Sequence, residues 1–276
     1  MSSRLIIYPT DFSECAKNAK AYAIAMGKAL KCKIRILHAV EIGSLASAEK
    51  NPDALLTSIK TLEEQAKKKL VKLKEEIESF GLECEYQILE GRTLFLKDYM
   101  ESLDPLMIVM GTTGKSGIEN KIFGSFAAQT IHNQKSIILA IPLKAKFNTL
   151  SKIVFATDFH KKDKTCLSFI NKITNYYGSD LQVVHISDNV AELQQEREKF
   201  SQLEEEITKV MRSHNIRFEF LYGDKVEDEL LEFLDSSKPD MLALVGRKRN
   251  FIERIFDKSL SKKMVNQTHV PVLVFS

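Results

Sequence analysis

Three glycines and a serine in one stretch of the chain are the residues best suited to chemistry. Gly111 and Gly114 are three residues apart, and Gly124-Ser125 follow after nine more residues. Glycine lacks a Cβ, so the backbone can turn tightly there and approach a ligand closely. Ser125 opens a helix-like stretch, where free N–H groups and the positive end of the helix dipole suit a phosphate. The stretch therefore predicts a phosphate-binding loop, to which Lys115 would add a point charge.

Two other interpretations apply to the same stretch. A glycine-rich turn after a strand is common in α/β proteins and needs no ligand. Gly114-Lys115-Ser116 also resembles the end of a P-loop, GxxxxGK[ST]. A P-loop would need glycine where Val109 stands and a helix beginning at the Lys-Ser pair, but Gly117 follows at once. The spacing therefore disfavours a P-loop.

The elements that must position this loop occur twice along the chain. Thr10-Asp11-Phe12 ends one short apolar run, and Thr157-Asp158-Phe159 ends another. The next apolar runs carry His38 and His185 at matching places, and later runs end at Gly111 and Gly246. Such self-similarity indicates two copies of one domain. Because the histidines recur with the repeat, we expect them to be packing residues and not catalytic bases.

Each copy alternates short apolar runs with helical patterns. This order predicts an α/β fold of two tandem domains, each with a five-stranded, mostly parallel sheet and helices on both faces. We place the domains at 1–145 and 150–276, with a linker at 143–150. The expected helices are 16–30, 58–80 (stopped by Gly81), 93–103, 125–133 and, in the second copy, 190–214.

Composition limits the function classes. Forty basic and 37 acidic residues nearly balance, so nucleic-acid binding is not expected. No run of eighteen apolar residues suggests a membrane span, and the N-terminus lacks a signal-peptide pattern, so we expect a cytoplasmic protein. The four cysteines form no CxxC pair, which predicts reduced, partly buried thiols and no zinc site.

In a doubly wound sheet, ligands bind at the carboxyl ends of the strands, where the strand order reverses. Pro9, Thr10 and Asp11 follow the first run, and Ala39 and Val40 end the second. The segment 111–117 follows the fourth run. The pattern predicts that these three segments meet at one edge of the first sheet.

These residues resemble a known family. The spacing of Gly111, Gly114 and Gly124-Ser125 is similar to the motif of ATP-binding universal stress proteins, and the opening 8–14 resembles their first strand and turn. The resemblance extends over both copies and implies flavodoxin-like (Rossmann-like) domains. It implies that ATP, or ADP or AMP, is bound with Mg²⁺ carried on the phosphates. The site residues that it implies are Pro9, Thr10 and Asp11 at the nucleoside; Ala39 and Val40 at the adenine; Met110, Gly111 and Gly114 around the ribose and phosphates, with Lys115 nearby; and Gly124, Ser125, Phe126 and Ala127 at the phosphates.

The second copy departs from this motif. Arg249 stands where Gly114 does, and Asp257 or Lys258 replaces Gly124. A side chain at the close-approach glycine should obstruct phosphates, so we expect the second copy not to bind ATP and Asp158 to be a structural residue of the turn. The cluster 247–249 is either a solvated basic loop or a site for another anion.

The resemblance implies a regulatory, stress-response ATP-binding protein with slow hydrolysis or autophosphorylation at most. The alternative is a nucleotide-independent protein-interaction module of the same fold. An ATP-dependent ligase or pyrophosphatase is disfavoured, because the first turn lacks a Ser-Gly-Gly-x-Asp-Ser loop. The apolar terminal strands 137–141 and 272–275 tend to seek pairing. We expect them to join the domains as an intramolecular pseudo-dimer, with a further homodimer left open.

Overall fold

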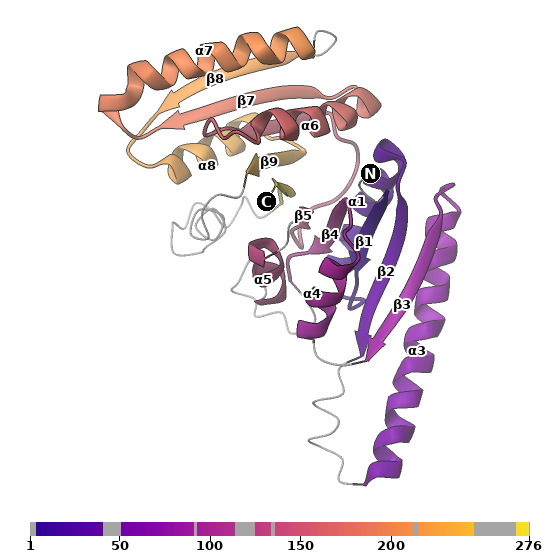
Figure 1. The fold of residues 1–276 in the computed structure, drawn as a ribbon. Coiled ribbons are helices and arrows are strands. Elements are labelled where there is room, and N and C mark those ends of the chain that lie inside the picture. The colour runs from indigo at the N-terminus through magenta and orange to yellow at the C-terminus, as the bar shows by residue number, and fades with distance from the viewer. Residues whose placement is uncertain are drawn as a thin grey trace.

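The computed structural model describes residues 4–40, 51–90, 93–113, 125–133, 136–211, 215–245 and 269–275 (Figure 1). The first half contains β1 (Leu5–Pro9), α1 (Glu14–Leu30), β2 (Lys33–Val40), α3 (Pro52–Glu78), β3 (Cys84–Glu90), α4 (Thr93–Ser102), β4 (Met107–Gly111), α5 (Ser125–Asn133) and β5 (Ile137–Ile141). The second half contains β6 (Lys152–Ala156), α6 (Asp163–Tyr177), β7 (Asp180–Ser187), the 3-10 turn η1 (Val190–Glu192), α7 (Leu193–Val210), β8 (Ile216–Tyr222), α8 (Val226–Ser237), β9 (Met241–Val245) and β10 (Val272–Phe275).

The strands form one sheet in the order β3-β2-β1-β4-β5-β10-β9-β6-β7-β8. Pairing within each half is parallel, and each half follows the Rossmann order without its sixth strand. The strand order reverses between β1 and β4, and again between β6 and β9. The predicted fold class is therefore confirmed, and the two strands that precede segments 9–11 and 111–117, β1 and β4, flank a switch point.

The two halves join through their last strands. β10 runs antiparallel to β5, with Leu273 opposite Leu139 and Val274 opposite Ile138. This is the pairing that the apolar terminal strands predicted. Both leucines are fully buried.

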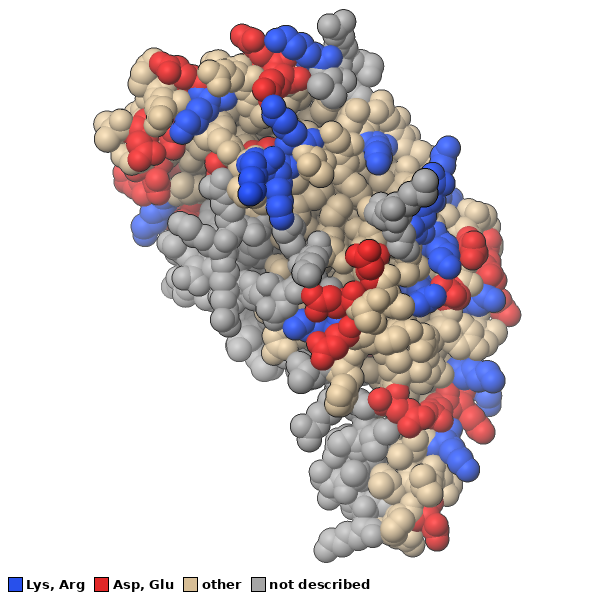
Figure 2. Space-filling model, in the orientation of Figure 1, with Lys and Arg blue, Asp and Glu red and all other residues tan. Residues whose placement is uncertain are grey.

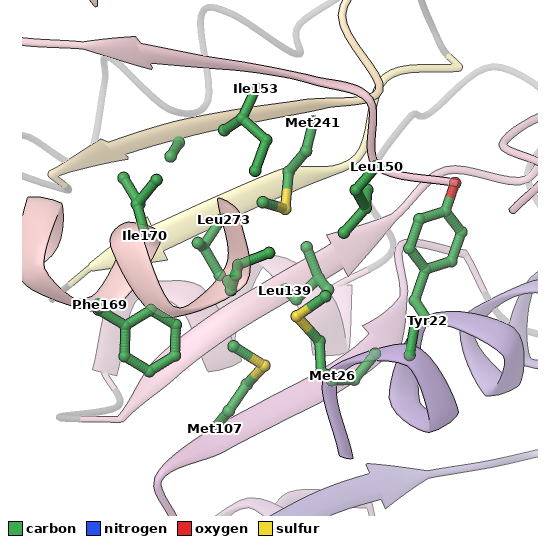
Figure 3. Packing of buried hydrophobic residues seen from close by; sticks show 14 of the residues in the cluster. Tyr22, Met26, Met107, Leu139, Leu150, Ile153, Phe169, Ile170, Met241 and Leu273 are labelled. Atoms are coloured by element: carbon green, nitrogen blue, oxygen red, sulfur yellow. The ribbon is translucent and has the colours of Figure 1, made fainter. Parts of the chain in front are cut away.

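Two hydrophobic clusters, one on each face of the sheet, cross this junction. Helices α1, α3, α6 and α7 cover one face of the sheet, and α4, α5 and α8 cover the other. Figure 3 shows Met26 and Met107 of the first half packed near Ile170 and Leu273 of the second. The segment predicted as a linker contributes Leu150 to the same cluster, so it is packed and not loose.

Several helix boundaries differ from the sequence prediction. α3 begins at Pro52, earlier than expected, because Asn51 caps it by accepting a hydrogen bond from the Asp53 amide. The long charged helix predicted at 190–214 is instead a 3-10 turn followed by α7, since Asn189 caps a separate first turn. α5 has the predicted bounds.

The surface carries both signs of charge. Figure 2 shows acidic and basic side chains interspersed over the face in view. In the described part of the chain, no helix has the length and apolar character needed to cross a bilayer.

Candidate functional site

The turn after β1 is held by its own side chains and by β2. The Thr10 amide donates to the Leu37 carbonyl at 2.8 Å, which continues the strand pairing by one residue. Phe12 then adopts a left-handed conformation with φ 62°, and its amide donates to Thr10 Oγ1 at 3.1 Å. His38 Nδ1 donates to the Thr10 carbonyl at 2.7 Å, and its ring packs on that of Phe12 at 4.5 Å. These bonds fix the backbone that leads into the candidate site.

Asp11 is positioned by the start of α1. Its Oδ1 accepts a hydrogen bond from the Ser13 amide at 3.0 Å, while Ser13 caps the helix by accepting from the Ala16 amide at 3.3 Å. Glu14 adds a negative charge in the first turn. The N-terminus of α1 is therefore already capped and electrically compensated, which makes it a poor place for a phosphate.

The carboxyl end of β4 lies beside this turn. Gly111 closes β4, and a Cβ added there would lie 2.9 Å from both the carbonyl carbon and the Sγ of Cys15. The first turn of α1 thus packs directly on the glycine. The Thr112 amide donates to the Ile141 carbonyl at 3.0 Å, which continues the pairing of β4 with β5 by one residue. Gly111 is required for packing here, whether or not a ligand also approaches it.

α5 offers a different helix start. It begins at Ser125, and its first turn contains no acidic residue. Gly114, Lys115 and Gly124, which precede it, lie outside the described residues. Of the α1 and α5 N-termini that follow the two strands of the switch point, only α5 is free of an acidic side chain in the described turn.

The turn after β6 repeats the first-half frame. The Thr157 amide donates to the Val184 carbonyl at 2.9 Å, and Phe159 is left-handed with φ 59°. The Phe159 amide donates to Thr157 Oγ1 at 3.0 Å, and His185 Nδ1 donates to the Thr157 carbonyl at 2.9 Å. Each histidine thus serves as a packing and turn-bracing residue, as the sequence predicted.

The hydrogen bonds around Asp158 differ from those around Asp11. The His160 amide, which corresponds to that of Ser13, donates to Asp163 Oδ2 at 3.1 Å, and the Thr157 hydroxyl donates to the same oxygen at 2.5 Å. Asp163 is 2% exposed, and burial raises its pKa, with a further contribution from the charge of Asp158. Sequence reasoning missed Asp163. An acidic residue at the start of a helix can accept hydrogen bonds from free amides, but the sequence analysis placed no helix start at Asp163.

A second acidic group approaches this turn from α7. Glu196 Oε2 lies 3.4 Å from His185 Nε2, and both side chains are largely buried. The ring of Phe159 covers His185 at 4.1 Å. The second-half turn is therefore enclosed by carboxylates of its own chain.

Comparison with known proteins decides the family. The model of the universal stress protein family matches residues 3–142 and again residues 149–276. The chain belongs to the universal stress protein family. It does so as two consecutive copies.

Individual relatives agree with this assignment. Universal stress protein MJ0531 of Methanocaldococcus jannaschii is 28% identical over 137 residues, which cover 49% of this chain and 80% of that protein. Universal stress protein MJ0577 of the same organism is 27% identical over 156 residues, 50% of this chain and 94% of that protein. A universal stress protein structure from Archaeoglobus fulgidus DSM 4304 has a TM-score of 0.72 at 16% identity, covering 99% of this chain and 98% of that one. At that identity the structural likeness shows the fold alone.

The predicted universal stress site residues differ in exposure. Pro9, Thr10, Val40, Met110 and Ala127 are buried, and Met110 of β4 and Ala127 of α5 belong to one core cluster on the α4 and α5 side of the sheet. Asp11, Ala39, Gly111 and Phe126 are half-buried. The half-buried residues have accessible surface that a ligand could contact. The buried residues would act mainly by supporting the backbone around the site.

The cysteines follow the prediction from composition. Cys15, Cys32, Cys84 and Cys166 are buried, and none forms a disulfide. Burial raises the pKa of Cys84 and of Cys166 to about 12. Neither thiol is therefore a nucleophile at neutral pH. Within the described ranges, no three His, Cys, Asp or Glu side chains come together as a metal cluster.

Proposed function

We propose that the first half binds an adenine nucleotide, ATP above all, at the switch point between β1 and β4. The chain would act as a regulatory stress-response protein whose state depends on that nucleotide. The universal stress family supports this class of function, and the strand order supports the location.

The segment between β4 and α5 carries the proposal. β4 ends at Gly111, α5 begins at Ser125, and the two ends of the family's glycine motif fall on these two residues. A loop that leaves a switch-point strand and enters a helix N-terminus brings free amides and a positive dipole to one place. Phosphates are best accommodated where no acidic side chain competes, which favours α5 over α1.

The described residues fit a nucleoside beside β1. Asp11 is half-buried, and its carboxylate accepts a hydrogen bond from the Ser13 amide at the carboxyl end of β1. A carboxylate in this position can accept hydrogen bonds from sugar hydroxyls. Ala39, half-buried at the end of β2, offers apolar surface for a base. Mg²⁺ would be bound through the phosphates.

Rapid catalysis is not part of the proposal. His38 donates through Nδ1 to the Thr10 carbonyl and packs on Phe12, so it braces the turn and is not presented as a general base. Asp11 alone does not form a hydrolytic set. Slow hydrolysis or autophosphorylation is the most that these residues support.

The test is mass spectrometry of nucleotide released from the purified full chain. We expect wild type to release adenine nucleotide and Gly114→Arg, which copies Arg249, to be empty yet folded. Arg249→Gly is the matched control and should keep the wild-type content. Nucleotide retained by Gly114→Arg would refute the phosphate placement. An empty wild type that also fails to bind added ATP would favour the interaction-module alternative.

A further inference from the structure

The polar group beneath the Thr-Asp turn comes from a different element in each half. In the first half the Tyr8 hydroxyl donates to the Ala16 carbonyl at 2.6 Å. In the second half, Phe155 stands at the position of Tyr8 and Asp163 at that of Ala16. The strand has lost a hydroxyl, and the helix has gained a carboxylate.

This exchange changes the partner of one turn amide. The Ser13 amide donates to Asp11, whereas the corresponding His160 amide donates to Asp163. Asp163 also accepts a hydrogen bond from the Thr157 hydroxyl. Asp158 is exposed, whereas Asp11 is half-buried.

We infer that Tyr8 and Ala16 are positioning residues that keep Asp11 on the turn amide and facing the nucleotide, and that Phe155 and Asp163 withdraw Asp158 from the equivalent place. This inference rests on the proposed function for its ligand. It assigns the difference between the halves partly to residues beneath the turn, in addition to the glycine loop.

The two residues must act as a pair, because both positions are buried. Ala16 is 4% exposed and Tyr8 is 1% exposed, so a larger side chain at 16 needs the room that phenylalanine leaves at 8. A carboxylate at 16 would then compete with Asp11 for the Ser13 amide. A charged acceptor inside the protein binds an amide more strongly than an acceptor in water.

The experiment compares ATP affinity, by calorimetry on the full chain, in four proteins. They are wild type, Asp11→Ala, the pair Tyr8→Phe with Ala16→Asp, and the pair combined with Asp11→Ala. Loss of one charge-assisted hydrogen bond should weaken binding by about tenfold or more. We expect the pair and Asp11→Ala each to show this loss, and the combination to show no further loss. A merely structural defect would instead add to the effect of Asp11→Ala.

A crystal structure of the pair variant separates this inference from the proposed function. We expect the Ser13 amide to have moved from Asp11 to the new carboxylate. If wild type does not bind ATP, the proposed function fails, but this hydrogen bond still decides the positioning claim. A folded pair variant with wild-type affinity, or with Asp11 still on the amide, would overturn the inference.

The mirror variant covers the case in which the first pair does not fold. Phe155→Tyr with Asp163→Ala gives the second half the first-half residues. We expect the His160 amide to return to Asp158 and the ATP affinity of the first half to stay unchanged. An amide that does not return to Asp158 would contradict the exchange.

Discussion

The two Thr-Asp-Phe turns share one frame and differ in chemistry. Both use the threonine side chain to hold a left-handed phenylalanine, and both receive a histidine from the neighbouring strand. In the first turn the Ser13 amide donates to Asp11, whereas in the second the equivalent His160 amide donates to Asp163. The shared residues therefore stabilise the turn conformation in both halves. They do not by themselves indicate a ligand site, which depends on the residues around the turn.

The helices that follow the turns show the same division. α1 begins with Ser13 as a side-chain cap, whereas Lys162 at the start of α6 makes no such bond. In the second half, Asp163 satisfies the amide of His160 from inside the helix. One half caps its helix with the half-buried Ser13, and the other satisfies the equivalent amide with the buried carboxylate of Asp163.

The largest effect is expected from a substitution in the β5–β10 junction, which joins the two halves. Leu273→Ala empties a fully buried position on β10, opposite Leu139 of β5. We expect the free energy of unfolding to fall by about 2–5 kcal/mol, measured with urea. Leu56→Ala on α3, where the residue is 56% exposed, is the control and should change it by less than about 0.5 kcal/mol. A similar small change for Leu273→Ala would mean that the halves are stable independently of the junction.

Gly111→Ala tests whether the glycine at the end of β4 serves packing as well as ligand approach. The added Cβ would lie 2.9 Å from the Cys15 carbonyl carbon and Sγ. We expect a loss of about 1–3 kcal/mol in unfolding free energy, since part of the obstruction is backbone. Cys15→Ala in the same chain removes the sulfur only, so it should rescue stability incompletely. Full rescue would show that the side chain alone requires glycine here.

Ser13→Ala sharpens the contrast between the two helix starts. Loss of the cap to the Ala16 amide should cost about 1 kcal/mol in thermal or urea unfolding. Lys162→Ala, at the N-cap of α6, makes the matched change where no side-chain cap exists and should cost less than about 0.5 kcal/mol. Equal losses of unfolding free energy in the two variants would show that the Ser13 side chain does not stabilise the start of α1 more than Lys162 stabilises that of α6.

The sequence predicted the repeat and the α/β class, because apolar runs and Thr-Asp-Phe recur in order. The strand-end location of the site stays a prediction. Helix starts were less predictable: Asn51 and Asn189 act through local caps that periodicity does not register. Asp163 was missed for another reason. The residue type does not show whether an aspartate is buried or exposed. The burial of Asp163 depends on the packing of α6 against the turn.

The smallest expected effect is a pH dependence that reports this burial. The folded-state pKa of Asp163 is raised above its ordinary value of 3.8, so the folded protein binds the proton more tightly than the unfolded chain. Its stabilising contribution is therefore fully present below the ordinary pKa and is lost as pH rises through the raised one. We expect the unfolding free energy of wild type, relative to Asp163→Asn, to fall as pH increases from about 4 towards 7.

Glu85 supplies a control of opposite sign within the same protein. Burial raises its pKa, but the hydrogen bond and charge of Arg35, with the charge of Lys33, outweigh that and lower it overall. Wild type relative to Glu85→Gln should therefore lose stability as pH falls through the lowered pKa. Parallel slopes for the two carboxylates would contradict the assignment. Opposite slopes would support the assignment that burial raises the pKa of Asp163, whereas the ion pairs of Glu85 lower its own.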